Sequence, residues 1–139
     1  MFDYDEPFQN LIDNLRDVDE PLRSAIVYRL SNATAEDMAE LQAAWQGVPA
    51  VRRQLLLSRL LDLSEVNFEV DFAAVALFAL EDEDDDVRRI AVEALWENQE
   101  APTMRHLLRL LQQDPSAGVR EAAARSLGRF VLAGELDEF

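Results

Sequence analysis

Residues 82–95 read DEDDDVRRIAVEAL, and this stretch decides the fold that the sequence predicts. Acidic residues come first, a Val-Arg pair follows, and small or apolar residues then recur three or four positions apart. This spacing places the small and apolar side chains on one face of an α-helix that begins after the acidic turn. The same order of residue types returns at 114–127, which reads DPSAGVREAAARSL. We therefore expect a repeated helical unit.

Two earlier stretches carry a looser version of this unit. An aliphatic-Arg pair opens each of them, at Leu22-Arg23 and at Val51-Arg52, and the apolar period continues without the small residues. A further helical pattern precedes each of the four pairs, so the sequence predicts eight helices in four antiparallel pairs. We expect first helices near 8–16, 35–45, 70–80 and 103–112, and second, inner helices near 22–31, 51–62, 87–98 and 119–132. Turn residues place the breaks near 17–21, 46–50, 64–69, 81–86, 98–102 and 113–118.

The string Asp-x-Asp-x-x-Val-Arg-x-x-Ala-x-x-Ala-Leu resembles the HEAT repeat, in the short bacterial form also found in phycobilisome-lyase-like proteins. It stands most completely at 82–95, and the resemblance covers nearly the whole chain. It implies an all-α fold, namely a right-handed α-solenoid (superhelix) of four HEAT-like, armadillo-like antiparallel helix pairs. The implied single repeat domain spans 1–139, with units at about 7–31, 34–63, 70–98 and 102–133.

In this family the turn Asp and the helix Arg form a hydrogen-bonded ladder from repeat to repeat. The resemblance assigns these residues to such a structural ladder: Asp17, Arg23, Arg52, Asp82, Arg88, Asp114 and Arg120. In the second unit Gln46, Val48 and Pro49 stand where the turn acids should be. We therefore expect the ladder to be interrupted there.

Composition argues against an enzyme. All 13 basic residues are Arg, there is no Cys, and His106 is the only histidine. Lysine Schiff bases, thiol nucleophiles, thiolate metal sites and histidine pairs are therefore excluded. No Ser or Cys is placed beside His106 by the pattern, so it is interpreted as a surface histidine. We expect no catalytic residue, no cofactor and no metal site, with a lyase subunit as the alternative.

Charge and length indicate the class of partner. The chain has 139 residues, 49% of them hydrophobic, and a formal net charge of -15. This acidity opposes binding to nucleic acid or to an anionic membrane. The amino terminus is acidic where a secretory signal would be basic, and the longest apolar run, 72–80, is too short to cross a bilayer. We therefore expect an acidic, cytoplasmic protein that does not bind membranes.

The arginines concentrate in the inner helices. Ten of the 13 lie there, together with only four acids, and the resemblance places these helices on the concave side. Helix register then assigns one set of side chains to the exposed inner face and to partner binding: Val27, Tyr28, Arg53, Leu56, Leu57, Arg89, Val92, Trp96 and Arg125. Aromatic, aliphatic and Arg side chains together are typical of binding hot spots. Trp96 is equally compatible with packing between repeats, and Trp45 is expected in the core.

We therefore expect a non-catalytic protein-protein interaction scaffold that binds an unidentified protein on the concave face of its inner helices. The alternative is a bilin-lyase or chromophore-chaperone-like subunit, in which inner arginines would hold a propionate-bearing ligand. Residues 134–139 resemble an inter-repeat turn, so the last repeat is expected to lack a cap. Either the chain is a piece of a longer array, which we favour, or this end self-associates.

The acidic turn also suggests calcium. Four acids fall at positions 1, 3, 5 and 12 of an EF-hand loop: Asp82, Asp84, Asp86 and Glu93. However, Val87 occupies the position of the essential glycine and is required as a core residue. A helix that begins there keeps the ligands from surrounding one ion, and we interpret these acids as helix caps.

Calcium titrated into the protein at physiological ionic strength should therefore give no saturable site tighter than about the millimolar range. Isothermal titration calorimetry is the measurement. A micromolar, one-to-one isotherm that Asp84→Ala abolishes would contradict this interpretation of the acidic turn.

Overall fold

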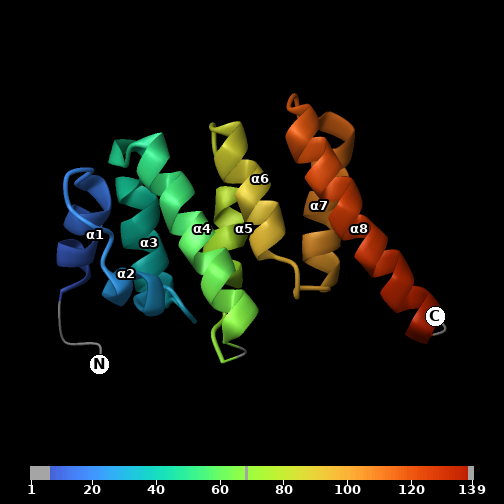
Figure 1. Ribbon diagram of the computed structural model, residues 1–139, viewed down its shortest axis with the longest axis horizontal. Helices are drawn as coiled ribbons and strands as arrows, with labels where there is room; N and C mark the ends of the chain where they lie inside the picture. Colours follow the sequence, from blue (N-terminus) through green and yellow to red (C-terminus); the bar gives the residue numbers. More distant parts are fainter. Residues whose placement is uncertain (1–6, 68, 138–139) are drawn as a thin grey trace. The chain divides into compact units, whose positions relative to one another are not determined.

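The computed structural model describes residues 7–67 and 69–137, and the side chains of 7–67 and 69–129. Within these ranges the chain forms eight α-helices, one short 3-10 helix and no β-strand (Figure 1). The predictions of an all-helical fold and of eight helices are confirmed. None of the described helices is long and apolar enough to cross a membrane. The chain divides into two compact units, 1–75 and 76–139, and the division falls inside α5 (Ala73–Ala79).

Unit 1 holds most of the large buried aliphatic side chains that the structure describes. Its helices are α1 (Phe8–Arg16), α2 (Ser24–Arg29), α3 (Ala35–Ala44), the 3-10 helix η1 (Trp45–Gly47) and α4 (Ala50–Val66). Helix α1 contacts α2, α3 and α4, and α2 also lies against α4. Fully buried side chains come from all four α-helices: Leu11, Leu15, Ile26, Leu41, Leu56 and Leu60. Trp45 is 3% exposed, which confirms its predicted core position.

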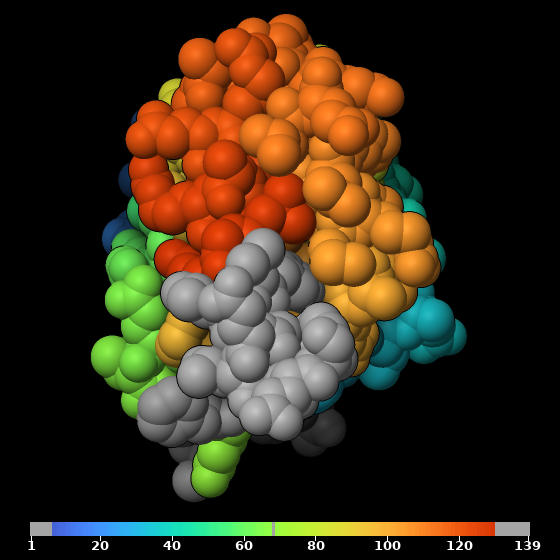
Figure 2. Space-filling view, turned by 90° about the vertical axis from the view of Figure 1, so that its right-hand side faces the viewer, coloured from blue at the N-terminus to red at the C-terminus, as the bar shows by residue number. Residues whose placement is uncertain are grey.

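Unit 2 is built around a long carboxyl-terminal helix. After the end of α5 it contains α6 (Asp85–Ala94), α7 (Ala101–Gln113) and α8 (Ala117–Asp137). Helix α8 lies against both α6 and α7, and Figure 2 shows α7 and α8 side by side. Ala91 of α6 and Ala123 of α8 are fully buried, as their positions in the repeat pattern require. Small side chains at these positions let neighbouring helix backbones approach closely.

Polar side chains determine where two of the helices begin. Thr34 Oγ1 accepts a hydrogen bond from the Asp37 backbone N–H at 3.0 Å, at the start of α3. Asp84 Oδ1 accepts one from the Val87 N–H at 2.9 Å, at the start of α6. Each bond satisfies an N–H group that has no partner within its own helix. The predicted role of Asp84 as a capping acid is confirmed.

The carboxyl-terminal end differs from the sequence-based expectation. Helix α8 continues to Asp137, so residues 134–137 are helical and the predicted inter-repeat turn is wrong there. One Gly within a helix costs only about 1 kcal/mol, and the Glu and Leu that follow Gly134 are good helix formers. Residues 138 and 139 lie outside the described part of the chain.

Arg88 connects the turn before α6 to the turn before α8. Its Nε donates to Asp114 Oδ2 at 2.8 Å and its Nη2 donates to Asp114 Oδ1 at 3.0 Å, which is a bidentate pair. Its Nη1 also donates to the Asp82 carbonyl at 2.9 Å. The Arg88 and Asp114 side chains are only 12% and 3% exposed. The hydrogen bond to Asp114 raises the pKa of Arg88, which favours the charged form of its guanidinium group.

The remaining residues assigned to the ladder make other contacts. Arg120 donates to the backbone carbonyl of Asp114 at 2.7 Å, and not to a turn carboxylate. Asp17 Oδ1 accepts from the Asp19 N–H at 3.0 Å within its own turn. The Arg23 side chain is exposed. The structure thus brings Arg88 and Asp114 together as a repeat-to-repeat pair.

Arg52 uses its guanidinium group differently from Arg88. It is 5% exposed and donates to three backbone carbonyls: Asn14 at 2.6 Å, Leu15 at 3.0 Å and Glu20 at 2.9 Å. Asn14 and Leu15 lie in the last turn of α1, where carbonyls have no partner within the helix. In the unit whose turn lacks acids, the buried arginine therefore caps the end of α1.

Replacing Arg52 by Ala should lower the free energy of unfolding by about 3 kcal/mol, because three hydrogen bonds to partly buried carbonyls are lost. Urea unfolding followed by circular dichroism measures the change. Arg125→Ala is the matched control, since the Arg125 side chain is 59% exposed and, among the side chains that the structure describes, pairs with Glu121 one turn away. We expect less than about 0.5 kcal/mol for the control. Equal losses in the two variants would contradict the capping role.

A double-mutant cycle on Arg88→Ala and Asp114→Asn should give a coupling energy of about 2 kcal/mol, because each single change leaves a buried partner unmatched. The asparagine keeps an acceptor for the Ser116 N–H that Asp114 Oδ1 binds at 2.9 Å. The same cycle on the exposed pair Arg125 and Glu121 provides the control, with about 0.3–0.5 kcal/mol expected. Additive effects at Arg88 and Asp114 would show that the pair contributes little.

Candidate protein-binding groove

A groove of about 400 Å³ runs between the inner helices α2 and α4 of unit 1. Its lining residues come from both helices: Ser24, Val27, Tyr28, Arg59, Asp62, Leu63 and Val66. Val27 is buried, Tyr28 and Leu63 are half-buried, and Val66 is 79% exposed. Val66 and its apolar neighbours therefore form an exposed apolar surface. Burying such a surface against a partner is favourable, because it removes apolar area from water.

The groove has a polar end and an apolar end. The Arg59 side chain reaches toward the residues just before α2, where its Nη1 lies 3.5 Å from the Leu22 carbonyl. Ser24, near this end, is exposed. Leu63 and Val66 lie one and two turns further along α4, on the same face as Arg59, because their spacing is i, i+4 and i+7. Charge and apolar surface are therefore separated along the groove.

Two hydrogen bonds join the segments that follow α2 and α4. The Asn32 N–H donates to the Asp71 carbonyl at 2.8 Å, and the Asp71 N–H donates to Ser31 Oγ at 3.0 Å. Asn32 has a φ of 53°, in the left-handed region that Asn tolerates better than most residues. These bonds tie the chain after α2 to the chain after α4, beyond the apolar end of the groove.

Three arginines of the inner helices make ion pairs with acids of the same compact unit. Arg29 lies 3.9 Å from Asp37, Arg89 lies 3.2 Å from Glu93, and Arg125 lies 2.8 Å from Glu121. These acids reduce the basic character that the sequence predicts for the inner surface. Among the described residues, no carboxylate lies within ion-pair distance of the exposed Arg59.

The exposure predicted for the inner-face residues is only partly correct. Five of them are buried, and their expected exposure is wrong: Val27, Arg53, Leu56, Leu57 and Val92. The reason is that α4 packs against both α1 and α2, and α6 packs against α8, so the buried arc of each helix is wider than a single stripe. The other four are half-buried or exposed: Tyr28, Arg89, Trp96 and Arg125.

The structure brings two predicted residues, Val27 and Tyr28, into the groove. It adds Arg59, which the helix register did not assign to the exposed inner face, and it adds Leu63 and Val66, which the prediction omitted because the helix was expected to end near residue 62. Helix α4 in fact continues to Val66. The apolar period of the sequence extends through Leu63 and Val66, and this was the signal that could have identified them.

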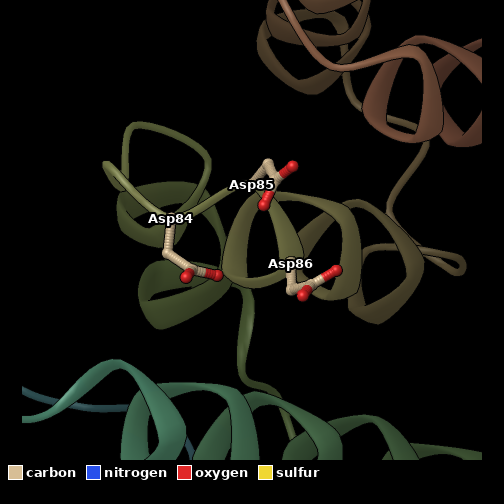
Figure 3. Close-up of side chains that lie close together, drawn as sticks. All are labelled: Asp84, Asp85 and Asp86. Carbon is tan, nitrogen blue, oxygen red and sulfur yellow. The ribbon is translucent and has the colours of Figure 1, made fainter.

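The acidic turn is explained by the start of a helix. Figure 3 shows Asp84, Asp85 and Asp86 at the beginning of α6, and one carboxylate oxygen from each lies within 4.8 Å of the others. Asp84 caps the helix, and the other two are exposed in its first turn, where acids interact favourably with the helix dipole. Glu93, the last acid of the EF-hand spacing, accepts a hydrogen bond from Arg89 Nη1 at 3.2 Å.

His106 lies on α7 and is half-buried. Its Nδ1 is 3.5 Å from Arg109 Nη2, and Arg109 also pairs with Glu81. General acid-base chemistry needs a group positioned to exchange a proton with substrate. The side chain that the structure describes next to His106 is the cationic Arg109, which is not a proton acceptor.

Comparison with protein families gives one match. The family model of HEAT repeats matches residues 73–138, which include α5, α6, α7 and α8. Comparison with curated proteins and with solved structures gives no match. An all-helical chain with this match fits an α-solenoid. The match, which spans slightly less than half of the chain, supports a HEAT-repeat family for this protein.

Proposed function

We propose that this protein is a non-catalytic protein-protein interaction scaffold of the bacterial cytoplasm. Its four helix pairs form a right-handed solenoid, and its inner helices bind a partner protein. HEAT repeats commonly serve as interaction scaffolds, and such repeats supply surfaces for many unrelated partners. The observation that carries the proposal is the α2–α4 groove of unit 1 with its exposed apolar end.

The composition of the groove favours a protein as ligand. Tyr28, Leu63 and Val66 supply aromatic and aliphatic contact area, and Arg59 stands at the rim. Protein interfaces are enriched in aromatic residues and Arg and depleted of Lys, and this chain has no Lys at all. The net charge of -15 disfavours nucleic acid and anionic membranes as partners.

A bilin-lyase or chromophore-chaperone-like role, typical of the phycobilisome-lyase-like subtype, is the alternative function. It requires arginines that are available to the propionates of the ligand. The α2–α4 groove contains one arginine. A smaller groove in unit 2, of about 220 Å³, contains Arg88 and Arg109, but these are already paired with Asp114 and Glu81. The geometry therefore supports a protein partner better.

Val66→Arg should weaken partner binding, because it places a charge on the most exposed apolar surface of the groove. Val51→Arg is the matched control: Val51 is 62% exposed on the same helix, about 20 Å along the axis from Val66. Partners are captured from the native lysate on wild-type and variant protein, identified by mass spectrometry, and titrated as purified proteins. We expect Val66→Arg or Tyr28→Ala to weaken binding by about 2 kcal/mol or more, and Val51→Arg to leave it unchanged.

Circular dichroism and thermal unfolding must first show that each variant is folded. Equal affinity for wild type and Val66→Arg would place the binding site outside the groove. A bilin or a nucleic acid that is retained in place of a protein would contradict the proposed function itself.

A further inference from the structure

The chemistry of the groove identifies the kind of segment that it fits. Arg59 is exposed, and among the described residues it meets no carboxylate, whereas Arg29, Arg89 and Arg125 each do. Its only described hydrogen bond, to the Leu22 carbonyl, is long at 3.5 Å. An arginine in this state offers most of its donors to a ligand, and a carboxylate is the acceptor that its planar fork matches best.

The spacing along α4 gives the distance between the two ends of the site. Arg59 and Val66 are related by i and i+7, which corresponds to about 10 Å along a helix. Tyr28 of α2 and Leu63 of α4 line the groove toward the Val66 end. A ligand that follows the groove therefore needs apolar side chains at one end and an acid about two helical turns away.

An acidic residue in the middle of the groove disfavours negative charge at the middle of the ligand. Asp62 is exposed on the same face of α4, between Arg59 and Val66. An acid placed opposite Asp62 would be repelled, so a uniformly acidic segment fits poorly. The favoured ligand is neutral or basic in its middle and acidic at one end.

Resting on the proposed function, we propose that the α2–α4 groove binds a helical segment of the partner protein. Its apolar anchors contact Tyr28, Leu63 and Val66, and an acidic residue about seven positions from the anchors pairs with Arg59. Two neighbouring helices form a groove into which the side-chain ridge of a third helix packs. A helical ligand also matches the i, i+4 and i+7 spacing of the α4 residues that line the groove.

A display library of short peptides held in helical form tests this proposal. The library is selected on the full chain and, in parallel, on Val66→Arg and on Arg59→Glu, with Val51→Arg as the control. On wild type and Val51→Arg we expect enrichment of apolar anchors with Asp or Glu about seven positions away. On Arg59→Glu the selected peptides should carry Lys or Arg at that position instead.

Titration of one selected peptide then gives the magnitudes. Arg59→Gln should weaken it about fivefold, as expected for one rim ion pair, and Arg59→Glu about tenfold. Replacing the acid of the peptide by Lys should restore its affinity for Arg59→Glu.

The outcomes separate the two proposals. The inference would be overturned by selected peptides that require Val66 but carry no acid, or whose affinity is unchanged by Arg59→Glu. The proposal that the groove binds a protein would still stand. A selection without enrichment would overturn the helical ligand and therefore the inference. Peptides that bind Val66→Arg as well as wild type would place the binding site outside the groove, which overturns the inference and removes the observation that carries the proposed function. As a control for folding, Arg59→Glu and Arg59→Gln must each unfold at the same temperature as the wild-type protein.

Discussion

Buried arginines at the turns are the interactions on which the rest of this structure depends. Helix ends leave carbonyl groups without partners, and a chain of short helices has many such ends. Arg52 satisfies three carbonyls at the end of α1 and in the following turn, while Arg88 binds one carbonyl of its own turn and the carboxylate of Asp114. Arginine at the same repeat position thus has two roles: Arg52 caps the end of a helix, and Arg88 forms an ion pair between two turns.

This use of arginine also shapes the surface. Ten arginines lie in the predicted inner helices, but Arg52 and Arg53 are buried and several others face acids of their own unit. The inner helices are therefore less basic than their composition indicates. In unit 1 the exposed Arg59 stands at the end of an apolar groove. A local feature of this kind confers specificity by position, because its charge and its apolar surface lie at a defined separation.

The groove itself depends on the length and packing of α4. Its first half is buried against α1 and α2, and its last turns extend Leu63 and Val66 to the surface beside α2. Hydrogen bonds between the segments after α2 and α4 hold the chain beyond the apolar end. A site between two rigid helices needs little ordering when a partner binds, and this reduces the entropic cost of association.

The sequence alone determined the helical content, the order and the approximate bounds of the helices, the core position of Trp45 and the capping role of Asp84. These properties follow from local periodicity and from turn chemistry, which act over a few residues. Only the tertiary structure decided which inner-helix side chains are exposed. Helix register assigns three side chains of α4 to the exposed face: Arg53, Leu56 and Leu57. They are buried because α4 packs against both α1 and α2. The carbonyl partners of Arg52 also come from residues more than thirty positions earlier in the chain, a separation over which no local sequence pattern carries information.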